Sequence, residues 1–238
     1  MTATFADRLP EDLRIGSDER LVVIPGNMLS AANRISRMLD RIRELPGKTL
    51  DAESYHALRR QESDDLSEPI WKLERSQYFH EPDEDPSWQA FNPGDWPRVL
   101  AVFESERSTA RAETDKYAQQ GSELRRLRIV ERPATPYLLW EMQWFKILAE
   151  EGTEIRVLDT EKVRELELDA PLPEVLVDEH ALYHVSYDEN WRACGARRID
   201  DPKIVRQAIR EISALWEPAE PFVRNFAREI VPLMPQAR

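Results

Sequence analysis

The chain has 238 residues, 41% hydrophobic and 33% charged, which suffices for one sizeable core or for a domain of roughly 150 residues with an extension. Its net charge of −12 disfavours nonspecific nucleic-acid binding, because Lys and Arg must neutralise the phosphate backbone. No stretch has the length of a membrane span, residues 1–10 lack the apolar core of a secretory signal, and the single cysteine, Cys194, excludes an internal disulfide. A cytoplasmic protein with no membrane partner is therefore expected.

Residues 1–66 are predicted to form a helical extension that precedes an α/β domain over residues 67–238. From Leu29 to Leu45, apolar residues recur at helical spacing and arginines occupy much of the rest, which predicts a basic amphipathic helix. We expect its apolar stripe to pack on the domain, or on a second copy in a homodimer. Direct nucleic-acid contact is the alternative, and it is disfavoured because the next predicted helix, over residues 51–62, is not followed by a third that completes a helix-turn-helix.

The segment from Ile70 to Trp96 is dense in aromatic residues and is expected to wrap the main domain. A base-stacking platform is the alternative, and the scarcity of Lys and Arg among the aromatics disfavours it. The next residues, Pro97 to Gln120, predict one long helix that Gly121 closes.

Residues 124–159 predict a strand, a helix and a second strand in succession. Leu124 to Val130 alternates apolar and basic residues, Thr135 and Pro136 form a helix start, and Gly152 fits the left-handed position that ends a helix before the strand from Glu154. Two strands joined by such a crossover are expected to be parallel neighbours, with the helix packed on the sheet.

The C-terminal third predicts a meander of strands followed by helices. Val175 begins a hairpin that turns at residues 178–180 and returns over residues 182–187, and a third strand extends to Ile199. A long helix starts at Pro202 and a shorter one covers residues 222–231. The predicted fold class is α/β, with a mixed sheet that has a βαβ crossover and a C-terminal β-meander and is flanked by helices.

Polar and aromatic residues on the crossover unit and the hairpin are the candidates for binding a ligand or partner. Glu141 lies among aromatic residues of the central helix, where a carboxylate can have a raised pKa and act as an acid or base. A structural ion pair with Arg126 or Arg128 of the preceding strand is the alternative. The full candidate set is Tyr137, Trp140, Glu141, Trp144, Arg126, Arg128, Asp178 and His184.

Standard catalytic and metal-binding motifs are absent from the sequence. It contains no G-x-G-x-x-G, no phosphate-binding P-loop, no H-E-x-x-H and no G-x-S-x-G. His180 and His184 are four residues apart, but on a predicted strand rather than a helix, and a single cysteine excludes a zinc ribbon. Cys194 is expected to be a small buried residue, although its basic neighbours could lower the pKa of an exposed thiol. We therefore predict no catalytic residue, metal or cofactor.

Several dispersed blocks carry a resemblance to a known family: Trp71-Lys-Leu-Glu-Arg-Ser-Gln-Tyr-Phe79, Asp85-Pro-Ser-Trp-Gln-Ala-Phe91, Gly94-Asp-Trp96, Leu127-Arg-Ile-Val130 with Pro133, Pro136 and Tyr137, Ile155-Arg-Val-Leu158, Val175-Leu-Val-Asp178 and Trp216-Glu-Pro-Ala219. Together they resemble an uncharacterised actinobacterial domain family whose members are often encoded beside Xre-type helix-turn-helix regulators. The resemblance extends from about Ile70 to Phe222 and implies a DNA-binding regulator as partner.

The order of the last blocks is also weakly similar to the phospholipase D fold, whose motif is H-x-K-x-x-x-x-D. His184 is followed by Ser186 in place of the Lys and by Trp191 in place of the Asp, so the similarity does not imply hydrolysis by that mechanism.

Two functions follow from the sequence. The first is a non-catalytic regulatory or interaction protein that binds a protein partner, such as a helix-turn-helix transcriptional regulator. The alternative is an enzyme or small-ligand binder, with a pocket at the C-terminal ends of the strands near Asp159, Tyr137, Glu141 and Asp178.

Overall fold

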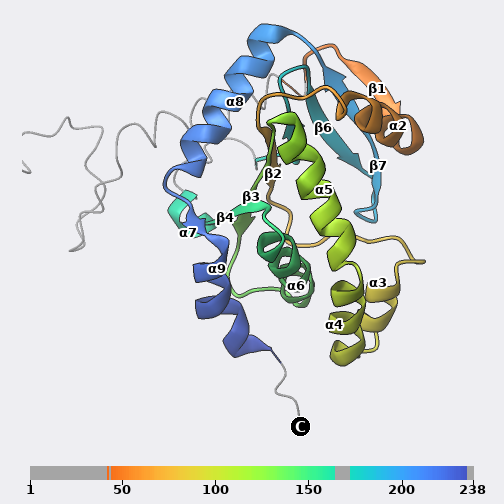
Figure 1. Cartoon of the computed structure of the whole chain (residues 1–238), viewed down its shortest axis with the longest axis vertical. Coiled ribbons are helices and arrows are strands. Elements are labelled where there is room, and N and C mark those ends of the chain that lie inside the picture. Colours follow the sequence, from red (N-terminus) through yellow and green to blue (C-terminus); the bar gives the residue numbers. More distant parts are fainter. Residues whose placement is uncertain (1–41, 43, 164–171, 235–238) are drawn as a thin grey trace, which may run out of the picture.

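The computed structural model of the chain describes residues 42, 44–163 and 172–234. Eight strands of this part form one sheet: β1 (Lys48–Asp51), β2 (Ile70–Glu74), β3 (Leu124–Val130), β4 (Glu154–Asp159), β5 (Val175–Val177), β6 (Leu182–Tyr187), β7 (Ala193–Ile199) and β8 (Glu220–Pro221). Their order across the sheet is β1-β7-β6-β5-β2-β3-β4-β8 (Figure 1). The neighbours β2, β3 and β4 are parallel and the remaining pairs are antiparallel, which confirms the predicted mixed α/β fold.

The crossover unit forms as the sequence predicts. Helix α6 (Pro136–Glu150) connects β3 to the parallel strand β4, and the Thr135 side chain accepts a hydrogen bond from the Leu138 N–H at 3.1 Å. Gly152 has a φ of +101°, so the chain leaves the helix through the left-handed conformation that glycine allows. The predicted meander is confirmed as well, with β5, β6 and β7 in antiparallel succession.

Strand β2 lies in the middle of the sheet, where the sequence predicts only an aromatic wrapping segment. It pairs in parallel with β3 and antiparallel with β5. Its Lys72 and Glu74 lie on the face that α6 covers, and they form an ion pair at 2.7 Å. Central strands of parallel sheets are normally continuous apolar runs. The charged residues Lys72 and Glu74 in this five-residue strand therefore make it hard to recognise as a central strand from the sequence.

The prediction of one helix over Pro97 to Gln120 is wrong, because the chain bends at Glu106. Helix α4 (Trp96–Ser105) ends there and α5 (Arg107–Gln120) begins, while the short helix α3 (Pro86–Phe91) precedes both. The Glu106 N–H bonds to the carbonyl oxygens of Val102 and Phe103, and the bend lets α4 and α5 each contact α6. A bend at a residue with normal helix propensity leaves no sequence signal.

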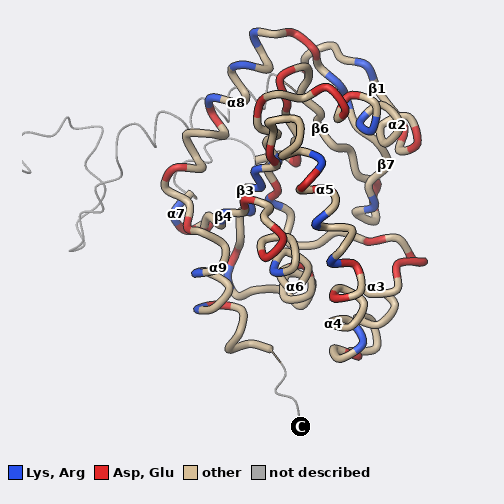
Figure 2. The backbone as a smooth tube through the Cα atoms, viewed as in Figure 1, with Lys and Arg blue, Asp and Glu red and all other residues tan. Residues whose placement is uncertain are grey.

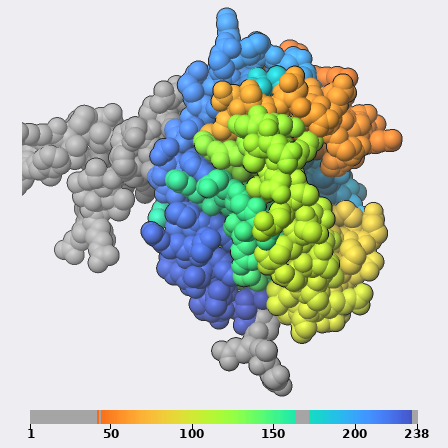
Figure 3. All heavy atoms as spheres, viewed as in Figure 1, coloured from red at the N-terminus to blue at the C-terminus, as the bar shows by residue number. Residues whose placement is uncertain are grey.

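Helices cover both faces of the sheet. Helix α8 (Pro202–Trp216) packs on one face with Leu73, Leu127 and Ile129, and α6 packs on the other with α3, α4 and α5. Helix α2 (Ala52–Glu62) lies over the antiparallel half beside Tyr183. In Figure 3, residues 202–234 (blue) form one side of the molecule, and α2 to α5 (orange to green) form the other.

The face under α2 and α6 contains charged side chains as well as apolar ones. Lys72 and Glu74 of β2 lie beside Arg126 and Arg128 of β3, and Arg128 is completely buried. Charged residues accordingly occur on central strands as well as on the outer helices (Figure 2). The sheet therefore has an apolar face under α8 and a partly ionic face under α6.

The predicted basic helix from Leu29 to Leu45 lies, apart from Ile42, Glu44 and Leu45, outside the described residues. Ile42 is fully buried in the core cluster under α8. The domain boundary after residue 66 stays a prediction. Two elements precede it: β1 pairs with β7, and α2 packs on the sheet.

The remaining described segments are short. Helix α7 (Thr160–Val163) follows β4, and α9 (Phe222–Asn225), η4 (Phe226–Ile230) and η5 (Val231–Leu233) form the helical run predicted over residues 222–231. Cys194 is exposed at the start of β7, so the expectation of a buried cysteine is wrong. Residue 194 lies just after the turn between β6 and β7, at a bulge where Ser186 pairs with Gly195 and Tyr187 with Ala193.

Candidate functional site

A pocket of about 430 Å³ lies where β2, β3 and β6 end and β5 begins. In open sheets, ligands commonly bind at the carboxyl ends of parallel strands, where neighbouring connections diverge. Strand β2 is such a point, because the chain continues from it to β3 and β4 on one side and later returns to β5 on its other side. The pocket is lined by Arg75, Ser76 and Gln77 after β2, Glu131 after β3, Leu172, Pro173 and Glu174 before β5, His184, Val185 and Tyr187 of β6, and Trp191.

Glu174 is a buried carboxylate of this pocket, with 8% of its surface exposed. It accepts hydrogen bonds from two backbone N–H groups of the segment after β2, from Arg75 at 3.0 Å and from Ser76 at 2.7 Å. Burial, together with the negative charge of Glu74, raises the pKa of Glu174 to about 7. The group therefore changes protonation near neutral pH.

Glu74 is a second buried carboxylate close to Glu174, and its cationic neighbours give it the opposite behaviour. Burial alone would raise the pKa of Glu74, but Arg126, Lys72 and Arg128 outweigh it and lower the pKa to about 2. The Glu74 carboxylate lies 2.7 Å from the Lys72 Nζ and 3.5 Å from the Arg126 Nε. Two neighbouring carboxylates thus have pKa values on opposite sides of the ordinary value, an arrangement that is frequent in functional sites.

Gln77 joins the two segments that follow β2 and β3. Its Oε1 accepts a hydrogen bond from the Glu131 N–H at 2.8 Å, and its Nε2 donates to the Ile129 carbonyl at 3.0 Å. The Thr135 hydroxyl, which also caps α6, donates to the Gln77 carbonyl at 2.8 Å. The pocket wall is therefore fixed by the same residues that start the central helix.

An aromatic wall, formed by Tyr187 and Trp191, lines part of the pocket. Trp191 is 50% exposed and has a φ of +63°, a conformation that is strained for a bulky residue. Its carbonyl accepts a hydrogen bond from the His80 N–H at 3.0 Å, and its own N–H donates to Asp188 at 3.1 Å. The ring lies 6.2 Å from that of Tyr187, which stacks on Phe79 at 5.0 Å. Backbone contacts thus hold an exposed indole at the pocket.

Of the eight candidate residues from the sequence, His184 lines this pocket. Arg128 and Glu141 form a buried ion pair at 2.8 Å, and a second bond from the Arg128 guanidinium reaches the Ser76 carbonyl at 2.6 Å. Burial raises the pKa of Glu141 despite the opposing charge of Arg128. The ion pair therefore contacts the pocket through the carbonyl of Ser76, one of the lining residues.

The other candidates have structural contacts in the core. Tyr137, Trp140 and Trp144 belong to an aromatic cluster on α6, where the Tyr137 hydroxyl donates to Glu81 at 2.7 Å. Arg126 lies with its guanidinium 4.5 Å from the Phe145 ring centre, beside Glu74.

Asp178 is completely buried at the other end of β5. It pairs with Arg59 of α2 and accepts hydrogen bonds from the N–H groups of His180 and Ala181 at 2.8 and 2.9 Å. Asp159, around which the sequence places a pocket, bonds to Arg132 at 2.5 Å. The structure thus brings Arg128 and Glu141 together, and leaves Asp178 and Asp159 at separate places.

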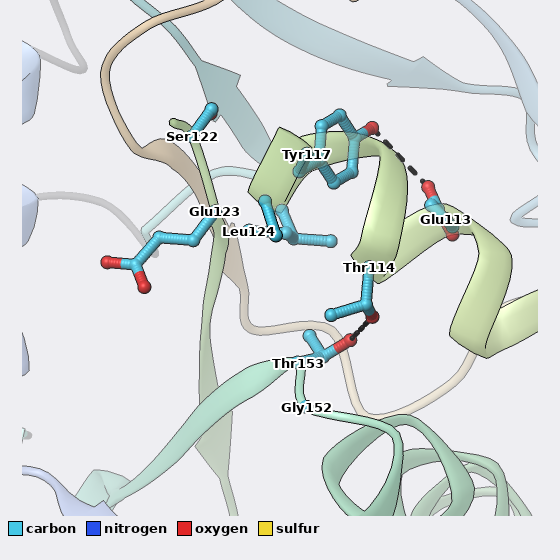
Figure 4. A pocket seen from close by; sticks show the side chains of 9 residues that line it. Glu113, Thr114, Tyr117, Ser122, Glu123, Leu124, Gly152 and Thr153 are labelled. Carbon is cyan, nitrogen blue, oxygen red and sulfur yellow. Dashed lines mark hydrogen bonds between the residues drawn. The ribbon is translucent and has the colours of Figure 1, made fainter. Parts of the chain in front are cut away.

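A smaller pocket of about 160 Å³ lies at the opposite end of the parallel strands, between the end of α5 and the starts of β3 and β4 (Figure 4). The Thr114 hydroxyl is 3.5 Å from that of Thr153, and the Tyr117 hydroxyl donates to Glu113 at 3.4 Å. Its side chains bond to one another, so the larger pocket is the stronger candidate site.

Sequence reasoning did not single out Glu174, Gln77 or Trp191. Trp191 has a weak signal, because it directly follows the turn residues Asp188-Glu-Asn190 and could be expected at a strand end. The residues next to Glu174 in the sequence do not indicate its role. Its environment is created by Glu74 at the end of β2 and by Ser76 just after that strand, both far away in the sequence.

The described residues contain no helix that is long and apolar enough to cross a membrane. They also contain no group of three or more His, Cys, Asp or Glu side chains arranged to hold a metal ion.

A comparison with curated proteins found no match to the chain. A comparison with protein families matches residues 59–227 to DUF6879, described as a domain of unknown function. The match extends from the second half of α2 to η4 and includes strands β2 to β8 and every residue that lines the larger pocket. The chain belongs to the DUF6879 family.

Proposed function

We propose that the pocket at the ends of β2 and β3 binds a small organic ligand, and that the protein is a non-catalytic, ligand-responsive module. The observation that carries this proposal is Glu174, a buried carboxylate that faces a pocket of about 430 Å³ and has a pKa of about 7. A volume of this size fits a small metabolite, and a few fixed polar groups among apolar walls are typical of ligand sites.

Binding fits the lining residues better than catalysis does. Ser76 is the lining residue with an aliphatic hydroxyl, and its Oγ donates to the Tyr78 carbonyl at 2.8 Å rather than to a base. Phospholipase D-type hydrolysis is not part of the proposal, because Ser186 and Trp191 replace the required Lys and Asp.

A fragment screen by NMR on the full chain tests the proposal. Fragments that occupy the pocket are expected to shift the indole N–H resonance of Trp191, which is identified by its loss in Trp191→Phe. The second pocket serves as a control, reported by the ring resonances of Tyr117. If no fragment shifts the Trp191 resonance, or if the shifts occur only at Tyr117, the proposal is wrong.

A second candidate function is binding to a protein partner, for which we propose a helix-turn-helix regulator. The net charge of −12 favours it, since an acidic surface is complementary to the basic surface with which such a regulator contacts DNA. In this proposal the protein acts in the cytoplasm, and the part of residues 1–66 that precedes β1 contacts the partner or a second copy of the chain.

Co-purification with the regulator encoded nearest to the gene tests the second candidate. The complex is expected to form at low ionic strength and to weaken as salt is added. A regulator that elutes separately from this chain in low salt would contradict it.

A further inference from the structure

Glu174 differs from three other buried carboxylates, Glu141, Glu74 and Asp178, in what neutralises it. Glu141 pairs with Arg128, Glu74 with Lys72 and Arg126, and Asp178 with Arg59. Within the described residues, Glu174 has only the backbone N–H groups of Arg75 and Ser76 as hydrogen-bond donors. The charge of Arg128 lowers the pKa of Glu174, but Arg128 forms its ion pair with Glu141. A cation that enters the pocket therefore gains an ion pair that Glu174 does not make with any described residue.

The aromatic wall supplies a second, independent reason to expect a cation. Trp191 lines the pocket and is 50% exposed overall, and Tyr187 lies beside it. Indole is the best of the protein aromatic rings for binding a positive charge over its face. The strained backbone of Trp191 keeps this ring where packing alone would not require it.

From these two features we propose that the pocket selects a small organic cation with a flat body, such as an amidinium or an aryl amine. This inference rests on the proposed ligand-binding function. The N–H groups of the cation bond to the Glu174 carboxylate, and its flat body lies against Trp191.

The remaining charges of the pocket agree with a cationic ligand. The guanidinium of Arg75 lies 3.3 Å from the Glu131 carboxylate, so part of its charge is neutralised at the pocket mouth. An anionic ligand would have to compete with Glu174 for the N–H groups of Arg75 and Ser76, with Glu74 behind it. A neutral ligand would leave the charge of Glu174 without compensation.

Three molecules of nearly equal shape separate charge from size. Benzamidine, benzamide and benzoate carry charges of about +1, 0 and −1 at neutral pH, and their affinities for the full chain can be measured by isothermal titration calorimetry. A charge-assisted hydrogen bond predicts that benzamidine binds roughly tenfold to a hundredfold more tightly than benzamide, and that benzoate binds most weakly.

The variant Glu174→Gln isolates the carboxylate. Its amide oxygen still accepts hydrogen bonds from the Arg75 and Ser76 N–H groups, and the variant is expected to bind benzamidine and benzamide within about threefold of each other. Glu113→Gln, in the second pocket, is the matched control and should keep the preference for benzamidine. The circular dichroism spectrum of each variant checks that it folds.

The outcomes distinguish this inference from the function on which it rests. If benzamide or benzoate binds as tightly as benzamidine, or if Glu174→Gln keeps the full preference, the cation proposal is wrong and ligand binding stands. It is also wrong if other fragments shift the Trp191 resonance while benzamidine does not. If no fragment at all reaches Trp191, the ligand-binding function itself fails.

Discussion

Glu174 and Glu74 show how strongly the surroundings decide the behaviour of a carboxyl group in this protein. Both are buried and near each other, but three cations surround Glu74 and two backbone N–H groups bind Glu174. The pKa of Glu174 is therefore raised to about 7, whereas that of Glu74 is lowered to about 2. Charge on Glu174 weakens the folded state above neutral pH, while charge on Glu74 strengthens it.

The first prediction concerns the pH dependence of stability. Because the folded-state pKa of Glu174 is raised, the folded state binds the proton more tightly than the unfolded state does, and stability is lost as pH rises toward 7. Glu174→Gln removes this loss. The difference in free energy of unfolding, variant minus wild type, is therefore expected to increase by about 2 kcal/mol from pH 5 to pH 8.

Urea unfolding of both proteins at several pH values measures this difference. The acid limb below pH 4, which reflects Glu74 and other paired carboxylates, should be common to both proteins. A constant difference between variant and wild type across pH 5 to 8 would contradict the raised pKa.

The buried pair of Arg128 and Glu141 gives a second prediction. Arg128→Met leaves the Glu141 carboxylate buried without its partner, which is expected to lower the free energy of unfolding by about 3–5 kcal/mol. The double variant Arg128→Met/Glu141→Leu should recover much of this loss, because the Glu141 carboxylate is then no longer buried without a partner. The remaining loss reflects Glu74, which also loses the charge of Arg128.

An exposed pair on the same helix provides the control for these variants. Lys146→Met breaks a pair with Glu150 in which both side chains are about 40% exposed, and it should cost less than about 1 kcal/mol. Chemical unfolding compares the variants directly. A single Arg128→Met variant as stable as Lys146→Met would show that the buried pair contributes nothing.

Trp191 gives a third prediction, in which stability and binding separate. Trp191→Asn relieves the left-handed backbone, because Asn tolerates that conformation, and removes a ring that is only half buried. These two effects on stability oppose each other. The free energy of unfolding should therefore change by less than about 1 kcal/mol, and the melting temperature should shift little. Benzamidine affinity should fall at least about fivefold, as the lost cation–π contact requires.

Thermal unfolding together with calorimetry checks both parts of this prediction. A strongly destabilised Trp191→Asn protein would assign the residue to packing rather than to the pocket.

The sequence allowed side-chain contacts to be predicted only between residues that are close along the chain. Arg128 and Glu141 are 13 positions apart, on consecutive elements of a βαβ unit whose geometry is known, and the sequence suggests their pairing. Glu174 and Ser76 are 98 positions apart, and their contact depends on β5 pairing with β2. The site was missed because its key carboxylate acquires its properties through this long-range pairing.

At the scale of elements, helices and strands with local signals were predictable. The start of α6 at Thr135 and Pro136, the start of α8 at Asp201 and Pro202, and the left-handed Gly121 and Gly152 all agree with the structure. Strand β2 and the bend at Glu106 have no such signals, since only their neighbours in space make them favourable.

The close approach of β1 to β7 gives a fourth prediction, at Gly195. This residue has a φ of +138°, and a Cβ atom there would overlap the carbonyl oxygen of Leu50 in β1. Gly195→Ala is therefore expected to lower the free energy of unfolding by about 2–3 kcal/mol and to detach β1 from the sheet.

Gly94→Ala is the matched control, because Gly94 also has a positive φ, of +81°, but no atom lies within 4 Å of its added Cβ. It should cost about 1 kcal/mol. Hydrogen exchange of the β1 amides, measured in both variants, checks the detachment. Equal β1 protection in the two variants would show that the overlap at Leu50 is relieved without loss of pairing.

At the scale of the whole molecule, the sheet has two halves of different construction. The parallel half, β2 to β4, is built from crossovers whose helices cover one face. The antiparallel half consists of the hairpin-connected strands β5 to β7 and of β1, which precedes β2 in the chain and pairs with β7. The pocket lies where the halves meet, so its walls come from both.

The position of β2 between β5 and β3 also bears on how the chain folds. β6 and β7 can pair early, because they are neighbours along the chain, whereas β2 must wait for β5, about a hundred residues later, before its second edge is closed. Closing so long a loop is entropically costly and slows folding. The pairing of β2 with β5, which brings the pocket residues together, is thus expected to form in the last steps of folding, after each half of the sheet has acquired its own local structure.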